Sequence, residues 1–295
     1  MKLLATLGLC ILAACARPLA PGEHPLVGRI WDVRAERYVA PQELFDRAAR
    51  ARHVILGEMH DNPEHHRLQR VVLEALAARG GKRQLAMEQF DTEYQAAIDA
   101  ARARGADVEA IADAGHFDRR GWNWPLYRPL VAFALEQDWP LAAANLSRDE
   151  ARANVADPAR ANLPQAPAGV KAALERDIID GHCGAAPEAK MLAGMVEAQR
   201  ARDARMASVL KSPSVLIAGA GHAQRDRGVP LYAGDGDVLS VAFIEAEEGN
   251  RSASDYDGAS YDYLWFTPRA ARADPCADQP RPSRSPSILG SMGLT

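Results

Sequence analysis

The chain has 295 residues, of which 35 are Lys or Arg and 39 are Asp or Glu, so its formal net charge is −4 at pH 7. Because the two signs are interspersed, the chain has no basic field of the kind that nucleic acids require, and we expect no nucleic-acid partner. After Ala14, no segment approaches the roughly 20 apolar residues of a transmembrane helix.

The first predicted element is an export segment over residues 1–14. Lys2 is its only charge, the run from Leu3 to Ala14 is too short to span a bilayer, and Leu12-Ala13-Ala14 leads into Cys15. This segment resembles the signal peptide and lipobox of bacterial lipoproteins. The resemblance implies that acyl chains on Cys15 anchor residues 15–26, a lipidated linker, to a membrane. The absence of Asp at position 16 is similar to lipoproteins of the outer membrane, so we expect a cell-envelope protein that faces the periplasm. The alternative is an ordinary signal peptide that is cleaved elsewhere.

Short apolar runs that end in Gly, Glu, Asn or His alternate with amphipathic helical stretches. This alternation predicts an α/β fold with a mainly parallel sheet flanked by helices, over about residues 27–268. The predicted strands are residues 53–56, 84–87, 141–144, 215–218, 238–244 and 261–266.

Most of the sequence between Asp91 and Leu210 has a helical pattern, including a long helix over residues 187–210. We expect a smaller helical subdomain, about residues 92–136 and 146–210, inserted into the α/β domain. On the long helix, one face carries Met195, Gln199, Asp203 and Met206. This mixed face is interpreted either as the lining of a cleft or as core.

Two cysteines, Cys183 and Cys276, lie outside the export segment. In an oxidising compartment an even pair favours one disulfide, and two free buried thiols are the alternative. From Arg269 onward the composition turns to Arg, Ala, Asp, Pro and Ser, which predicts a disordered tail over residues 269–295, above all beyond Cys276.

Polar side chains follow the predicted strands at the points where the strands end. These residues are Glu58 with His60, Glu88, Asn145 and His222. Because ligands of an open parallel sheet bind beyond the carboxyl ends of its strands, we expect these side chains to surround one ligand pocket. A single histidine at a strand end is more often structural, but two histidines with two glutamates favour binding.

The densest polar segment is residues 57–66, with three histidines and three acids in ten residues. Asp61 or Asn62 can cap the helix that Pro63 begins, so capping alone would account for them. The predicted pocket includes, besides the strand-end residues, Asp61, Asn62, His65, Gln199 and Asp203.

An aromatic cluster, Trp122, Trp124 and Tyr127, precedes an apolar helix. Such side chains suit the wall of a pocket for a planar ligand, and core packing explains them equally well.

Three segments together resemble the ChaN family: residues 55–62 with His65-His66, residues 219–222 with Gly228-Val229-Pro230, and residues 261–267. The resemblance covers about residues 27–268. It implies a haem-binding lipoprotein of iron uptake, with haem held between two subunits by tyrosine, which favours a binding protein over an enzyme and leaves a catalytic role open. The expected partners are therefore haem, a second copy in a haem-dependent homodimer, and a haem uptake receptor. Tyrosine is an established axial ligand of haem iron. The candidates are Tyr127, which we favour for its neighbouring tryptophans, and Tyr94.

The strand-end pattern also resembles the wider Tiki and TraB superfamily and erythromycin-esterase-like proteins. This implies an alternative, a hydrolase in which Glu58, His60 and His222 bind a divalent metal or supply a general base. A third interpretation, a scaffold without a small ligand, is disfavoured because burying Glu58 or Glu88 without a partner costs several kcal/mol.

Overall fold

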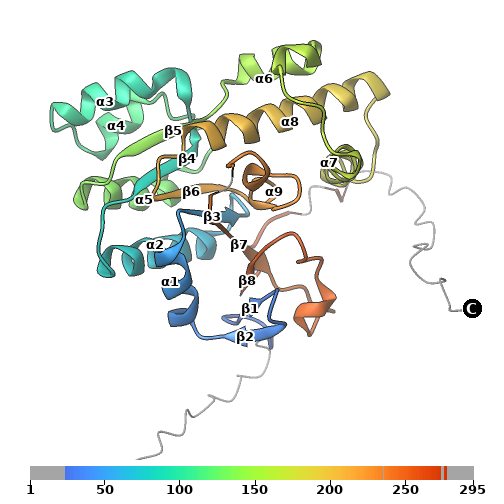
Figure 1. Cartoon of the computed structure of the whole chain (residues 1–295), viewed down its shortest axis with the longest axis horizontal. Coiled ribbons are helices and arrows are strands. Elements are labelled where there is room, and N and C mark those ends of the chain that lie inside the picture. The colour runs from blue at the N-terminus through green and yellow to red at the C-terminus, as the bar shows by residue number, and fades with distance from the viewer. Residues whose placement is uncertain (1–23, 235, 274–275, 278–295) are drawn as a thin grey trace, which may run out of the picture.

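The computed structural model describes residues 24–234, 236–273 and 276–277, and in this part of the chain the predicted α/β fold is confirmed. The sheet has eight strands in the order β2-β1-β8-β7-β3-β6-β4-β5 (Figure 1). The strands are β1 Ile30–Asp32, β2 Arg37–Val39, β3 His53–Glu58, β4 Gln84–Asp91, β5 Leu141–Asn145, β6 Ser214–Gly219, β7 Val238–Glu245 and β8 Tyr263–Thr267.

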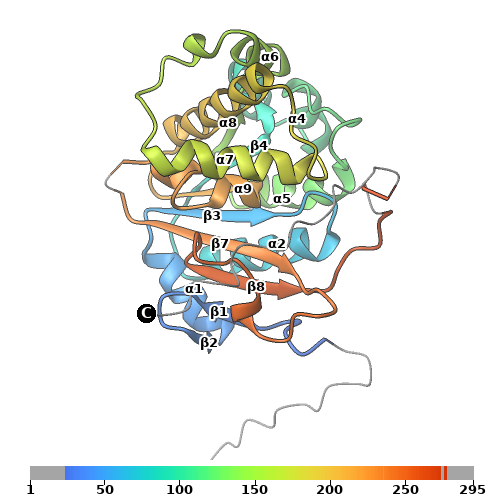
Figure 2. The same cartoon turned by 90° about the vertical axis from the view of Figure 1, so that its right-hand side faces the viewer.

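From β8 to β5 along the sheet, all neighbouring strands are parallel. In contrast, β1 pairs antiparallel with both β2 and β8. The arrows of β3, β7 and β8 point to the same side of the molecule (Figure 2). The carboxyl ends of the parallel strands therefore share one edge, where the polar residues were predicted to meet. The sequence missed β1 and β2 because three-residue strands are too short to show an alternating pattern.

Helices cover both faces of the sheet. They are α1 Pro41–Arg50, α2 Pro63–Ala78, α3 Gln95–Ala103, α4 Val108–Ala114, α5 Trp124–Glu136, α6 Arg148–Ala156, α7 Ala168–Gly181, α8 Ala189–Val209 and α9 Ala220–Ala223. Short 3₁₀ turns are η1 Thr92–Tyr94, η2 Pro158–Ala161, η3 Val229–Leu231 and η4 Ala253–Asp255. The long predicted helix appears as α8.

The two faces of the sheet contribute to separate apolar clusters. One face packs with helices α1 to α5, for example Leu56 and Met87 with Ile98 of α3. The other face packs with α8 and α9, for example Leu216 with Met206. Helices α3 to α5 thus share the core of the sheet, whereas α7 and α8 add a small cluster of their own around Val170, Leu174 and Val196.

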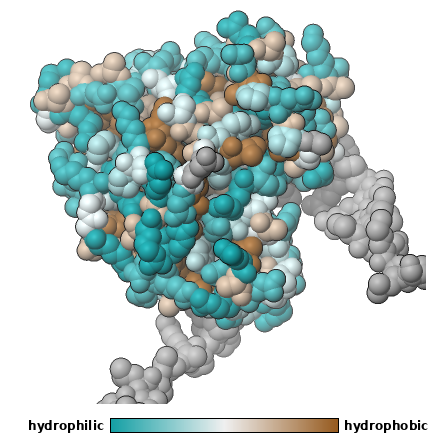
Figure 3. Space-filling view, viewed as in Figure 1, coloured by the Kyte–Doolittle hydropathy of each residue, from teal (hydrophilic) through white to brown (hydrophobic). Residues whose placement is uncertain are grey.

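The surface is mostly hydrophilic on the face shown in Figure 3, where apolar residues form small separate patches. Among the described residues, the exposed large hydrophobic side chains are Met59, Met191 and Leu231. No helix between residues 24 and 277, as far as they are described, is long and apolar enough to cross a membrane.

The structure joins Cys183 and Cys276, the predicted pair, in a disulfide with their Cα atoms 5.6 Å apart. The predicted disorder from residue 269 onward is wrong for residues 269–273. The Ala270 N–H donates to Glu245, and Arg272 forms ion pairs with Glu245 and Asp61. Charge pairing thus holds a segment that buries little apolar surface. The export segment, Cys15, the linker before His24 and residues 278–295 lie outside the described residues.

Candidate functional site

Two carboxylates lie on either side of β6 at the carboxyl edge of the sheet. Glu58 ends β3 and is paired in register with Gly219 of β6. On the other neighbouring strand, Glu88 of β4 accepts a hydrogen bond from the Gly219 N–H at 2.8 Å. The parallel register therefore brings together acids that are 30 positions apart in the sequence.

Glu58 is the centre of a buried hydrogen-bond network and is only 2% exposed. Its Oε1 accepts from the Tyr127 hydroxyl at 2.6 Å and contacts His60 Nδ1 at 3.0 Å. Its Oε2 accepts from Gln69 Nε2 at 2.6 Å and lies 3.2 Å from His66 Nδ1. Burial would raise the pKa of Glu58, but His66, His60 and Tyr127 outweigh it and hold this pKa below its usual value. The carboxyl group is therefore ionised at neutral pH.

His60 connects this network to the surface, because its side chain is 42% exposed. With Nδ1 directed at Glu58, the other ring nitrogen, Nε2, is not used by that contact. Burial lowers the pKa of His60, but Glu58 and Glu88 outweigh it and raise this pKa overall. A Cβ atom at position 219 would lie 3.0 Å from the His60 ring, so glycine permits the close approach. The rings of His60 and Trp122 pack edge to face, with 4.7 Å between their centroids.

His222 lies between two further carboxylates. Its Nδ1 is 2.6 Å from Asp203 Oδ1 of α8, and its Nε2 is 3.3 Å from Glu88 Oε1. Burial lowers the pKa of His222, but Glu88 and Asp203 outweigh it and raise the pKa to about 10. Burial also raises the pKa of Asp203 to about 6. Gln199, one turn before Asp203, contacts His222 Nδ1 at 3.2 Å.

Five side chains therefore alternate between acid and base along the edge of the sheet. We call this set the strand-end chain: Glu58, His60, Glu88, His222 and Asp203. The predicted alternative of a metal bound by Glu58, His60 and His222 is not supported. In the described part of the protein, no group of three or more His, Cys, Asp or Glu side chains has an arrangement that could hold a metal ion. The physical reason is that the carboxylate oxygens contact imidazole nitrogens instead of converging on one point.

Tyr127, the favoured iron ligand, is in the wrong environment. Its side chain is fully buried, and its hydroxyl donates to Glu58. Burial and the Glu58 charge raise its pKa far above the usual value, so a phenolate does not form there. The sequence predicted Tyr127 ahead of an apolar helix, whereas it lies within α5, and no local pattern showed which way α5 turns this side chain.

Tyr94, the second candidate, lies at the surface at the start of the α3 region. It is partly exposed and stacks on His116, with 4.1 Å between ring centroids. Among the described residues, none forms a hydrogen bond with its hydroxyl.

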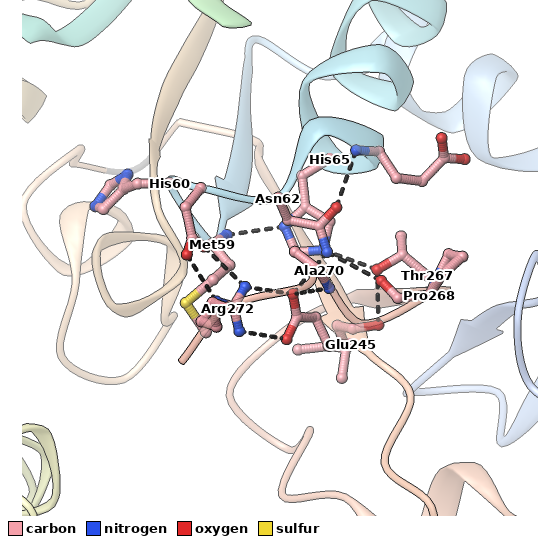
Figure 4. Close-up of polar contacts among 12 residues, drawn as sticks. Met59, His60, Asn62, His65, Glu245, Thr267, Pro268, Ala270 and Arg272 are labelled. Carbon is pink, nitrogen blue, oxygen red and sulfur yellow. Dashed lines mark hydrogen bonds and ion pairs between the residues drawn. The ribbon is translucent and has the colours of Figure 1, made fainter. Parts of the chain in front are cut away.

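Two residues predicted for the pocket instead have structural roles. Asn62 caps α2 by accepting from the Glu64 N–H, and its amide donates to Glu245 and to the Pro268 carbonyl. His65 is fully buried: its Nδ1 accepts from the Met59 N–H, and its Nε2 contacts Thr267 Oγ1 at 2.8 Å (Figure 4). Both residues tie the segment after β3 to β7 and β8, which follow it by about 180 residues or more.

Asn145 also lies apart from the strand-end chain, because its Oδ1 accepts from the Leu146 N–H and from Arg202. Conversely, Gln69 and His66 were not predicted as partners of Glu58. Their spacing of three on α2 places them on one helix face, which is the signal that could have found them.

A hollow of about 390 Å³ opens beside His60. Its lining residues are His60, Asp61, Arg119, Arg120, Gly121, Trp122 and Asn123. Most of them belong to the loop between α4 and α5, residues 115–123, which we call the α4–α5 loop. The same loop carries His116, the stacking partner of Tyr94.

With the geometry established, the comparisons identify the family. A family model described as "Haem-binding uptake, Tiki superfamily, ChaN" matches residues 44–232. The chain belongs to this family. The ChaN protein of Campylobacter jejuni, solved with cofacial haem, has a similar fold: the TM-score is 0.69, the sequence identity is 23%, and the match covers 80% of this chain and 95% of that chain.

Weaker similarities extend beyond the ChaN family. The toxin effector domain RRSP of Vibrio vulnificus has a TM-score of 0.43 and 14% identity, with 84% of this chain and 42% of that chain covered. A mutant erythromycin esterase in its open conformation has a TM-score of 0.40 and 11% identity, with 80% and 81% covered. A search of curated proteins gave no match.

Proposed function

We propose that this protein binds haem along the α4–α5 loop, at the carboxyl edge of the sheet, and serves haem and iron uptake. Membership of the ChaN family supports haem as the ligand. The observation that supports this location of the haem is the composition of the α4–α5 loop. Trp122 offers a flat apolar surface, and Arg120 offers a charge that suits a carboxylate of a planar ligand, whereas the neighbouring Arg119 pairs with Asp113 and Glu109.

Tyr94 is the proposed iron ligand. Of the two predicted candidates, it is the one that is partly exposed, since Tyr127 is buried against Glu58. A phenolate is a hard oxygen donor, which suits ferric iron outside the cytoplasm. The stacked ring of His116 holds the phenol in place.

Titration of ferric haem into purified protein tests this assignment. We expect a Soret band with a stoichiometric endpoint and a tyrosinate-to-iron charge-transfer band. Tyr94→Phe should remove the charge-transfer band, whereas Tyr38→Phe, a control on β2 near the other end of the sheet, should leave it unchanged. A Tyr94→Phe variant with the wild-type spectrum would refute the assignment of Tyr94 as the iron ligand.

We further propose that acyl chains on Cys15 anchor the protein to the outer membrane, facing the periplasm, where it pairs with a second copy through haem and delivers haem to or from an uptake receptor. Intact mass before and after Cys15→Ser tests the anchor, since the variant should lose the mass of the lipid. Sedimentation with and without haem tests the dimer. A haem-loaded protein that sediments as a monomer would contradict it.

A second candidate function is favoured by the pairing of Glu58 with His60. A buried carboxylate that holds Nδ1 of a half-exposed histidine leaves Nε2 as a general base for hydrolysis. A screen of ester and peptide substrates with wild-type protein and His60→Gln tests it. Turnover by the wild type that His60→Gln abolishes would support this function, and equal rates in both proteins would exclude it.

A further inference from the structure

His222 has no ring nitrogen left for a ligand. Nδ1 is held by Asp203 at 2.6 Å and Nε2 faces Glu88 at 3.3 Å. A carboxylate accepts but does not donate, so both contacts are favourable only when both nitrogens carry hydrogen. The His222 side chain is 9% exposed, and the side chains of Glu88 and Asp203 are 6% and 0% exposed. Little solvent therefore screens the interaction.

His60 is arranged differently. Its Nδ1 is held by Glu58, but its Nε2 lies beside the backbone of Gly219, and its side chain is 42% exposed. Glu88, which approaches Gly219 from the other side, also raises the proton affinity of His60. The two histidines of the strand-end chain thus have different access to a ligand although both lie among carboxylates.

We propose that Asp203 is a positioning residue that, together with Glu88, keeps His222 doubly protonated, so that His222 is a fixed cation and His60 alone exchanges protons with a ligand. The cation keeps Glu88 ionised and in place beside Gly219. The inference rests on the second candidate function only for the role of His60. Its claim about His222 concerns the protein without a substrate.

The other groups near His222 do not supply the negative charge that balances the His222 cation. Gln199 on α8 is neutral; its amide nitrogen lies 3.2 Å from His222 Nδ1, and a doubly protonated ring requires this amide turned so that Oε1 faces the ring. Arg202 and Tyr232 interact with Asp203, and the charge of His60 opposes that of His222. Among the described residues, none forms a hydrogen bond with Asp203 Oδ2, although this oxygen is buried. Asp203 therefore acts on His222 through its other oxygen, Oδ1.

Histidine-selective ¹⁵N labelling of the full chain tests the proposal, since the chain has eight histidines and His222→Gln identifies the signal. In the wild type, both His222 nitrogens should remain protonated at pH 7 and up to about pH 8.5, whereas His60 should lose its proton at a lower pH than His222 does. In Asp203→Asn, the His222 pKa should fall by roughly 1–3 units, because one charged partner is lost. Asp149→Asn, at an exposed position of α6, is the control and should leave both titrations unchanged.

Two results would overturn the proposal: a wild-type His222 that loses a proton near pH 6.5, or an Asp203→Asn variant that titrates as the wild type does. The first requires no variant to fold. Because neither measurement involves a substrate, an absence of hydrolysis would refute the second candidate function and leave this inference intact.

Discussion

Removing the hydroxyl of Tyr127 separates its structural role from the role of an iron ligand. In the structure this hydroxyl donates to Glu58 at 2.6 Å, in a fully buried position. A hydrogen bond to a charged group contributes about 1.5–3 kcal/mol. We expect Tyr127→Phe to lower the free energy of unfolding by an amount in the lower half of this range, because His60 and Gln69 still contact Glu58.

Urea unfolding of Tyr127→Phe and of Tyr38→Phe measures this effect. Tyr38 is partly exposed, and among the described residues none forms a hydrogen bond with its hydroxyl, so the loss of this group should change the free energy of unfolding by less than about 0.5 kcal/mol. The haem spectrum should be unchanged in both variants. A Tyr127→Phe variant that is as stable as the wild type but loses the charge-transfer band would refute our description of this residue.

Three further predictions concern the same edge of the sheet and its connections. Gly219→Ala would place a Cβ atom 3.0 Å from the His60 ring; because this ring is half exposed it can swing outward, so we expect a loss of less than about 1 kcal/mol but a shifted ¹⁵N signal of His60 Nδ1. An unshifted signal would contradict the close approach. Burial lowers the pKa of His65 from 6.5 to about 4, so the unfolded chain takes up the proton first, and stability should be full above pH 6.5 and fall by about 3 kcal/mol as the pH drops to 4. His65→Gln should flatten this part of the unfolding profile, and an equally steep profile in the variant would exclude His65 as the cause. Replacing both Cys183 and Cys276 by Ser, which opens a link across 93 positions, should cost about 2–5 kcal/mol, and reduced wild type should unfold like the variant. Equal stability of the oxidised and reduced wild type would contradict this.

The sheet could be predicted because its strands are buried on both faces and therefore appear as continuous apolar runs. The same parallel arrangement explains why Glu58, Glu88 and His222 could be expected at one edge from spacing alone. The contact of Asp203 with His222 follows from the face of α8 that carries Gln199 and Asp203, which helical periodicity also shows.

The errors arise from contacts that no local pattern encodes. Asn62 and His65 were expected in the pocket, but their partners Glu245 and Thr267 follow them by about 180 and 200 positions. Tyr127 was expected to face a ligand, and the tilt and rotation of α5 over the sheet place it against Glu58 instead. Such docking depends on tertiary packing, which periodicity cannot supply.

The proposed location of haem can be measured directly, because ferric haem is paramagnetic and broadens the signals of nearby nuclei. In histidine-labelled protein, haem should first broaden the signals of His116 and His60, on or beside the α4–α5 loop. His53 begins β3 at the amino end of the parallel strands, about 20 Å from His60, and its signal should remain sharp. Broadening of His53 with His116 and His60 unaffected would contradict the account.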